Sequence, residues 1–340
     1  ELIAAKLPLA TAALARAEGA GDEFAAACAR VQVAMGLGWR GVEFDRAATL
    51  LAEARASLVA QRKLHWAAVA LEYQGLLALR RLDVPGGIAT LEAAAAEHRV
   101  GSGPGNVAHA LTFIGYARRA VGDLSGAQRA FDEARVLVAG TRVVTWLRAT
   151  IGAAYTALAL GDDDTARETF RAAHDRAVEV GDRRIAGTAL VGLAVLARQA
   201  GEHGRCVALL RAATAEALDG GDATDAVTAA GMLAESLLAR GDAEEAAVVL
   251  GASEAVDDEV GVRVDFGLAY DDAPVRRAVA ERLGAERAAD LAGDGRAIGL
   301  AQAIGRAADL LLSGQMRVQG WKVLSPGRAG PSVATARRRR

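Results

Sequence analysis

The sequence predicts an all-α protein, a right-handed α-solenoid of about six helical hairpins followed by a helical cap. Three observations predict this fold. A pattern of small, large and small residues recurs at intervals of 39 or 40 residues. Hydrophobic residues make up 52% of the chain but aromatic residues only 4%, and the 340 residues include only 6 prolines. Apolar content of this kind, mainly Ala, Leu and Val, favours closely packed helices over an aromatic-rich sheet.

The recurring pattern is a small residue, a large apolar residue four positions later and a small residue seven positions after the first. This spacing puts the three side chains on one helical face. Small residues on either side of a large one let a second helix approach closely. The six occurrences are Ala47/Leu51/Ala54, Gly87/Leu91/Ala94, Ala127/Phe131/Ala134, Ala166/Phe170/Ala173, Cys206/Leu210/Ala213 and Ala246/Leu250/Ser253.

A further small residue lies twelve positions before each pattern, on the predicted first helix of the hairpin, with Met35 as the exception. These residues are Gly75, Gly115, Ala154, Ala194 and Ala234. The turns between the two helices pair a glycine with an acidic residue, at 122–123, 161–162, 201–202 and 241–242, and read RLDVPGG at 81–87. Glycine can end the first helix in the left-handed conformation, and the acidic residue can cap the second. Hairpins of this kind stack into a superhelix because one pair cannot bury its apolar faces alone.

Three regions follow from this pattern: a helical repeat array over 1–261, a helical cap over 262–312 and a basic tail over 313–340 that we expect to be disordered. Seven basic residues and no acidic residue follow Asp309. We expect the chain to be part of a larger protein because it begins with Glu1 instead of Met. No run resembles a membrane span, and the two cysteines, Cys28 and Cys206, suit a reducing cytoplasm.

Catalytic, cofactor-binding and metal sites are not predicted. The P-loop motif is absent, and the mildly acidic body, with a formal net charge of −2 for the chain, is a poor match for nucleic acid. The acidic clusters 162–164, 257–258 and 271–272 are expected to cap helices. The histidines do not form metal-binding pairs, and we expect all five to be surface or partly buried residues. They are His65, His98, His109, His174 and His203.

The small–large–small hairpin resembles the tetratricopeptide repeat, although its unit is longer than the usual length of about 34 residues. The terminal proline and early tryptophan of that consensus are not reproduced. A unit of this greater length resembles the sensor regions of large bacterial transcriptional regulators of the LuxR/MalT type and their AfsR-like relatives. Residues 250–252, 283–284 and 295–297, with the sequences LGA, LG and GRA, match motifs at the end of that region. The resemblance covers about residues 20–312 and includes no catalytic motif.

The resemblance implies a cytoplasmic module of a transcriptional regulator that binds a protein, a peptide or a small effector, with self-association as a further possibility. DNA would be contacted only through a domain absent from this chain, because no helix-turn-helix follows residue 312. A free-standing scaffold with no DNA-linked role is the alternative. A third reading, an α/α-barrel enzyme, would require the array to close into a ring with acidic residues at its centre.

The candidate binding surface is the concave face, which the first helix of each hairpin lines in stacked repeats. Positions one and four after the small packing residue are expected to point inward. Tyrosine and arginine there are typical of binding hot spots. The candidate residues are Tyr116, Arg119, Tyr155, Leu158, Arg198 and Glu235. The alternative is that these side chains only fill the space between repeats.

Overall fold

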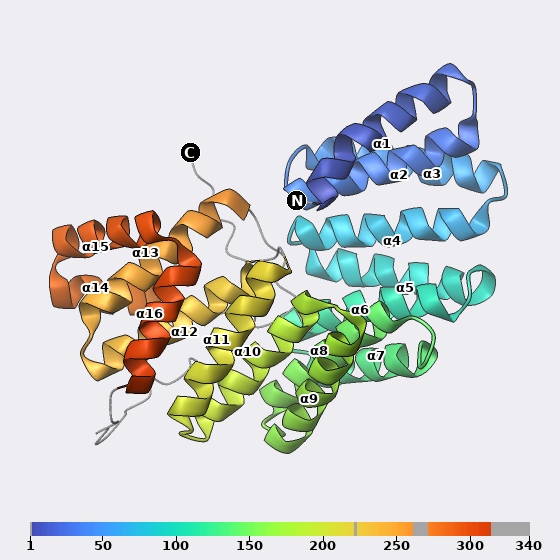
Figure 1. Ribbon diagram of the computed structural model, residues 1–340. Helices are drawn as coiled ribbons and strands as arrows, with labels where there is room; N and C mark the ends of the chain where they lie inside the picture. The colour runs from blue at the N-terminus through green and yellow to red at the C-terminus, as the bar shows by residue number, and fades with distance from the viewer. Residues whose placement is uncertain (1, 221–222, 261–270, 314–340) are drawn as a thin grey trace. The chain divides into compact units, whose positions relative to one another are not determined.

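The computed structural model describes residues 2–220, 223–260 and 271–313, and these ranges contain sixteen α-helices and no strand (Figure 1). The all-α prediction is confirmed. Most of the tail predicted to be disordered, 314–340, lies outside the described residues, while Ser313 ends the last helix. The described chain divides into two compact units, 2–156 and 157–313, and the division falls within helix α8.

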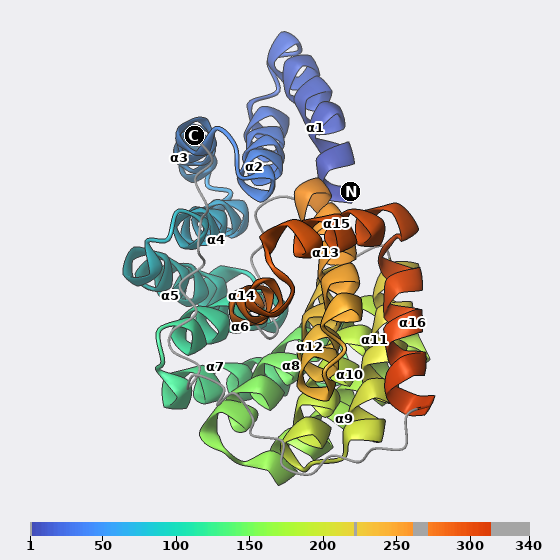
Figure 2. The same cartoon turned by 90° about the vertical axis from the view of Figure 1, so that its left-hand side faces the viewer.

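The N-terminal unit is a stack of antiparallel helices in which each helix from α1 to α6 packs against the next one (Figures 1 and 2). Contacts between α2 and α4 and between α4 and α6 join successive hairpins. The helices are α1 (Leu2–Gly19), α2 (Glu23–Arg40), α3 (Phe44–Ala60), α4 (Leu64–Arg80), α5 (Val84–Gly101), α6 (Pro104–Ala120), α7 (Leu124–Leu137) and α8 (Val143–Leu160).

The C-terminal unit continues the same stacking from α9 to α13 and ends in the three-helix cap α14 to α16, which packs on α11, α12 and α13. Its helices are α9 (Asp163–Val180), α10 (Arg183–Gln199), α11 (His203–Asp219), α12 (Thr224–Arg240), α13 (Ala243–Val260), α14 (Ala273–Leu283), α15 (Ala285–Ile298) and α16 (Leu300–Ser313).

All six small–large–small patterns lie on the second helices, α3, α5, α7, α9, α11 and α13, and all eighteen of their residues are buried. The large side chains are held by glycines on neighbouring first helices. A Cβ atom on Gly115 of α6 or Gly152 of α8 would meet the Phe131 ring at 2.6 and 2.3 Å, and one on Gly192 of α10 would meet the Phe170 ring at 2.3 Å. Glycine at these three positions therefore leaves room for a phenylalanine ring of the neighbouring helix.

The predicted turn chemistry is confirmed in most hairpins. The side chains of Asp83, Asp123 and Asp162 accept a hydrogen bond from the backbone N–H three residues later. Glu202 makes no such bond, and its carboxylate instead accepts a hydrogen bond from Arg205 at 2.9 Å. The residue before the cap is a left-handed glycine in four of the turns, whereas Leu82 takes this conformation, with φ of 66°, between α4 and α5.

The crossing of α13 and α15 depends on two glycines from the motifs that carried the family resemblance. A Cβ atom on Gly251 would lie 2.1 Å from the carbonyl oxygen of Ala292, and one on Gly295 would lie 1.9 Å from that of Val248. Arg296, next to Gly295, donates to Glu254 at 2.9 Å. The LGA and GRA motifs thus allow backbone contact and add an ion pair beside it.

Helix α8 is long and apolar enough to span a membrane by length and composition, with a mean hydropathy of 1.3 over residues 143–160. In the structure 61% of this window is buried. Sequence reading did not single out this run. Its burial is the behaviour of a core helix in a helical stack.

Candidate binding surface

The six candidate residues form what we call the first-helix ridge. Each lies one or four positions after the small packing residue of a first helix. In the N-terminal unit these are Tyr116, Arg119 and Tyr155 on α6 and α8. The guanidinium carbon of Arg119 lies 5.6 Å from the centre of the Tyr155 ring, a cation–π arrangement. The Tyr116 hydroxyl donates to the Arg148 carbonyl at 2.7 Å. Both tyrosines are buried, while Arg119 is half-buried.

In the C-terminal unit the ridge contains Leu158, Arg198 and Glu235. Arg198 on α10 donates to the Glu235 carboxylate on α12 at 2.6 Å, and the two side chains are 18% and 14% exposed. Leu158 packs against the apolar core of this unit. Beneath the ion pair, burial raises the pKa of the Cys206 thiol to about 11, with Arg198 opposing the shift and Glu235 adding to it. A thiol with this pKa is un-ionised and unreactive at neutral pH.

The two units repeat one geometric relation along the ridge. Arg119 and Arg198 both lie four positions after a small packing residue, and each reaches the side chain one position after the small residue of the next first helix, Tyr155 or Glu235. Sequence reading named these four residues but did not predict that they contact one another. Burial assigns the two tyrosines to packing, and it leaves Arg119, Arg198 and Glu235 with side-chain surface at the ridge.

A buried polar cluster in the N-terminal unit was missed by sequence reading. Glu72 on α4 is 3% exposed, and its carboxylate contacts the imidazoles of His98 on α5 and His109 on α6. The prediction that all five histidines are surface or partly buried residues is wrong for His98, which is fully buried. A sequence signal exists: His98 lies eleven residues after Gly87, where four of the other five hairpins have the apolar residues Leu58, Val138, Ala177 and Ala217 and the last has Asp257.

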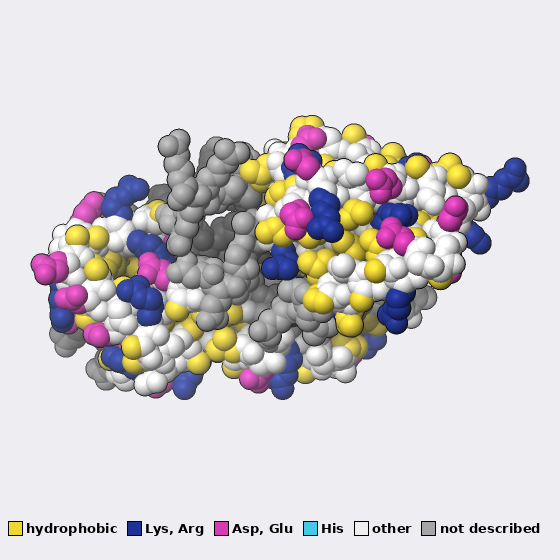
Figure 3. Space-filling model, turned by 90° about the horizontal axis from the view of Figure 1, so that it is seen from above, with side chains coloured by type: hydrophobic (Ala, Val, Ile, Leu, Met, Phe, Trp, Pro, Cys, Tyr) yellow, Lys and Arg dark blue, Asp and Glu magenta, His cyan; other side chains and the backbone are white. Residues whose placement is uncertain are grey.

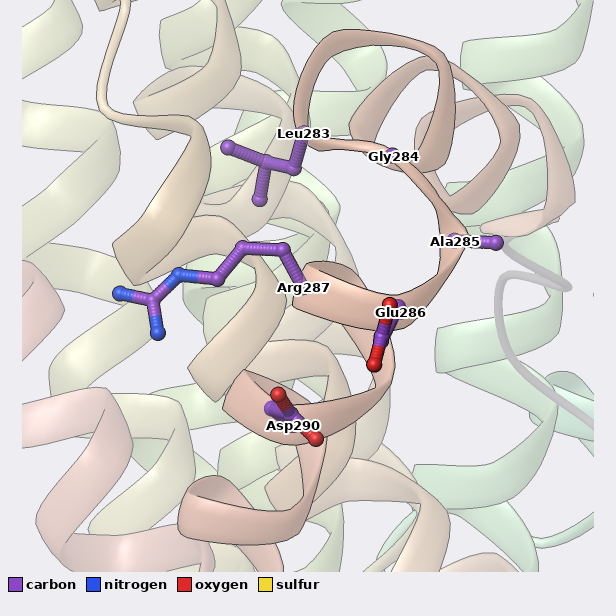
Figure 4. A pocket seen from close by; sticks show the side chains of 6 residues that line it. All are labelled: Leu283, Gly284, Ala285, Glu286, Arg287 and Asp290. Atoms are coloured by element: carbon purple, nitrogen blue, oxygen red, sulfur yellow. The ribbon is translucent and has the colours of Figure 1, made fainter.

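The described residues contain no group of three or more histidine, cysteine or acidic side chains arranged to hold a metal ion. A hollow at the turn between α14 and α15 is lined by residues 283–287 and Asp290 (Figure 4). Its lining side chains are exposed, except for the half-buried Leu283, and they point away from a common centre. It lacks the convergent, buried polar groups of a small-molecule site.

Charges on the described surface are mixed in sign. On the face in Figure 3, basic and acidic side chains alternate with apolar ones and do not form a patch of one sign. Charges of the described residues are also paired between helices, as in Arg99–Glu133, Arg183–Asp219 and Arg287–Glu244. A surface of this kind lacks the basic stripe that nucleic acid requires.

Comparison with known proteins supports the helical-repeat fold. No family model and no curated protein matches the chain. Among solved structures, the apo form of RapI is 11% identical, covers 92% of this chain and 97% of its own, and has a TM-score of 0.51. Aspartyl phosphate phosphatase F from Bacillus subtilis is also 11% identical, covers 94% and 97%, and has a TM-score of 0.49. At this identity the likeness to RapI shows the fold alone, and the chain is a tetratricopeptide-like helical-repeat protein.

Proposed function

We propose that the chain is a cytoplasmic, non-enzymatic module that binds a protein, a peptide or a small effector on its first-helix ridge, and that it belongs to a transcriptional regulator. The observation that carries the binding role is the repeated arginine contact of the ridge. In both units a half-buried arginine on one first helix meets an aromatic or acidic side chain on the next, Arg119 with Tyr155 and Arg198 with Glu235. The same position elsewhere holds the apolar residues Leu79, Leu158 and Leu238.

These contacts give a ligand a way to change helix packing. A carboxylate on a partner can compete with Glu235 for the guanidinium of Arg198, and the contact between α10 and α12 then loses one ion pair. Because the pair is only 14–18% exposed, its loss also leaves a partly desolvated Glu235. Ligand binding would therefore change the spacing of neighbouring repeats, and a sensor module would pass on this change as its signal.

The regulator role rests on the resemblance of the cap motifs to the end of LuxR/MalT-type and AfsR-like sensor regions. Gly251 and Gly295 fall on those motifs, and both lie at the close crossing of α13 and α15. A free-standing scaffold is the competing function, and the fold suits it equally. The parent reading frame distinguishes the two: an upstream P-loop ATPase or an adjacent helix-turn-helix supports the regulator, and an isolated gene supports the scaffold.

Binding is tested by capture of partners from the native cytoplasm on the immobilised full chain. The variants are Arg119→Ala in the N-terminal unit and Arg198→Leu with Glu235→Leu in the C-terminal unit, where the double change avoids an unpaired charge. Arg205→Ala is the matched control, because Arg205 on the second helix α11 pairs with the N-cap residue Glu202 and both side chains are exposed. We expect at least one ridge variant to lose a partner that the control retains. Identical capture by all variants would exclude the ridge as the binding surface.

A further inference from the structure

The cluster of Glu72, His98 and His109 links three helices of the N-terminal unit through one carboxylate. One carboxylate oxygen of Glu72 accepts a hydrogen bond from His98 Nε2 at 3.0 Å, and the other accepts one from His109 Nδ1. His98 is fully buried, and its Nδ1 has no hydrogen-bond partner among the described residues. His109 is 28% exposed, so the cluster has one side open to solvent.

The fold does not require polar residues at these positions. The equivalents of Glu72 in other first helices include Ile151 and Val191, and the equivalents of His98 in other second helices include Leu58 and Ala177. All four are buried. Val69 occupies the position of His109 on the preceding first helix. Polar residues recur at some of these positions, with Thr112 equivalent to Glu72 and Arg148, Thr188 and Thr228 equivalent to His109. A carboxylate at the position of Glu72 does not recur in the other first helices, and an apolar residue there avoids desolvating a charge.

The hydrogen bonds fix how the cluster responds to protons. With both imidazoles neutral, each donates one N–H to the Glu72 carboxylate, and the cluster carries one buried negative charge. A first proton makes the cluster neutral and strengthens a hydrogen bond by charge. A second proton on the imidazoles leaves an excess positive charge and gives His98 Nδ1 a buried hydrogen with no acceptor.

Other titratable side chains lie near the cluster. From α4, His65 lies with its ring centre 6.3 Å from that of His98, and Tyr73 adjoins Glu72. Burial raises the pKa of Tyr73 to about 12, with Glu72 adding to the shift and Arg148 of α8 opposing it, so Tyr73 stays neutral. Arg55 of α3 is already held by Glu97 of α5 at 2.7 Å.

We propose that Glu72, His98 and His109 form a proton-operated latch that holds α4, α5 and α6 together and loosens when the cluster takes up a second proton. This device is independent of the proposed binding partner. Burial acts to raise the pKa of Glu72, but the hydrogen bonds and charges of His109 and His98 outweigh it and lower the pKa. The carboxylate therefore stays ionised at neutral pH.

The test is hydrogen–deuterium exchange on the full chain at about pH 7.5 and about pH 5.5, corrected for the intrinsic pH dependence of exchange. Peptides from α5 and α6 report on the latch, and peptides from α11 and α12 are the internal control. We expect protection of α5 and α6 to fall about ten-fold more than that of α11 and α12, the effect of losing one buried hydrogen bond. An equal change in both regions overturns the proposal.

The variant that isolates the cluster is Glu72→Val with His98→Leu and His109→Val, which installs the residue types of the other repeats. It is expected to fold and to lose the extra pH dependence; a folded variant that keeps it overturns the proposal. Ring nitrogen NMR of the unaltered protein provides a second test. We expect a second proton to bind over the same pH range in which α5 and α6 lose protection, and binding without loss of protection contradicts the latch.

Discussion

The N-terminal unit and the C-terminal unit use the same hairpin frame but fill two buried positions of it differently. Glu72 and His98 are buried in α4 and α5, whereas the equivalent residues of α10 and α11 are Val191 and Ala217. The small–large–small pattern is buried in both units. The pattern therefore determines how helices pair, while nearby core positions are free to carry polar groups. Four predictions test this difference between the units.

The largest effect is expected from Glu72→Ala. It removes the acceptor of two imidazoles, one of them fully buried, and should lower the free energy of unfolding by about 3 kcal/mol. Val191→Ala at the equivalent position of α10 removes only apolar contacts and should lower it by about 1.5 kcal/mol. Urea unfolding of both variants checks the difference. Equal losses would mean that the polar cluster contributes nothing specific.

Gly152→Ala and Gly192→Ala should each destabilise their unit by about 2 kcal/mol, because the added methyl group enters a phenylalanine ring. Gly305→Ala in α16 is the matched control. It meets nothing within 4 Å, so the higher helix propensity of alanine should stabilise the protein by about 0.5–1 kcal/mol. Thermal unfolding should show opposite signs for control and test variants. A Gly152→Ala variant that is more stable than the unaltered protein would contradict this prediction.

Leu82→Gly should stabilise the N-terminal unit by about 1 kcal/mol. Leu82 adopts a left-handed conformation that glycine takes in the turns at Gly122, Gly161 and Gly201. The side chain is 45% exposed, so little packing is lost with it. Val121→Gly, one residue before a turn that already has its glycine, is the control and should be destabilising. Equilibrium unfolding distinguishes the two, and no gain from Leu82→Gly would exclude strain at this turn.

The smallest effect is expected for the loss of the Glu72 charge in acid. Its pKa is lowered in the folded protein, so the stability it contributes is present above its unfolded value of 4.5 and is lost as the pH falls through the folded value. Glu72→Gln should therefore remove part of the acid destabilisation of the N-terminal unit. Unfolding measured on both proteins between neutral pH and about pH 3 checks this. If both proteins lose the same stability between neutral pH and acid, the ionisation of Glu72 does not contribute to the acid destabilisation.

The sequence predicted the period, the pairing of helices and the buried pattern because these depend on spacing within one helix or hairpin. The contacts of the candidate site could not be predicted in the same way. Glu72 and His98 lie 26 residues apart on the two helices of one hairpin, and Arg198 and Glu235 lie 37 residues apart on successive first helices, so neither contact follows from the spacing within one helix. Aligning the repeats reveals His98 as an exception, but it does not identify Glu72 as the side chain that it contacts.

The division of the chain into two units was also not visible in the sequence. The repeat interval is 39 residues between Ala127 and Ala166 and 40 elsewhere, and this change of one residue does not mark residue 156, where the division falls. Periodicity reports which faces are apolar. It does not report how tightly successive hairpins are joined.

The most direct test of the account is a double-mutant cycle between Gly152→Ala and Phe131→Leu. The central claim is that a small residue on a first helix makes room for a large residue on a neighbouring second helix. The preceding repeat has the reverse arrangement: its second helix carries the smaller Leu91, and the next first helix has Phe113 at the position equivalent to Gly152. We predict that the loss of about 2 kcal/mol from Gly152→Ala disappears when residue 131 is leucine. The same loss with phenylalanine and with leucine would contradict the claim.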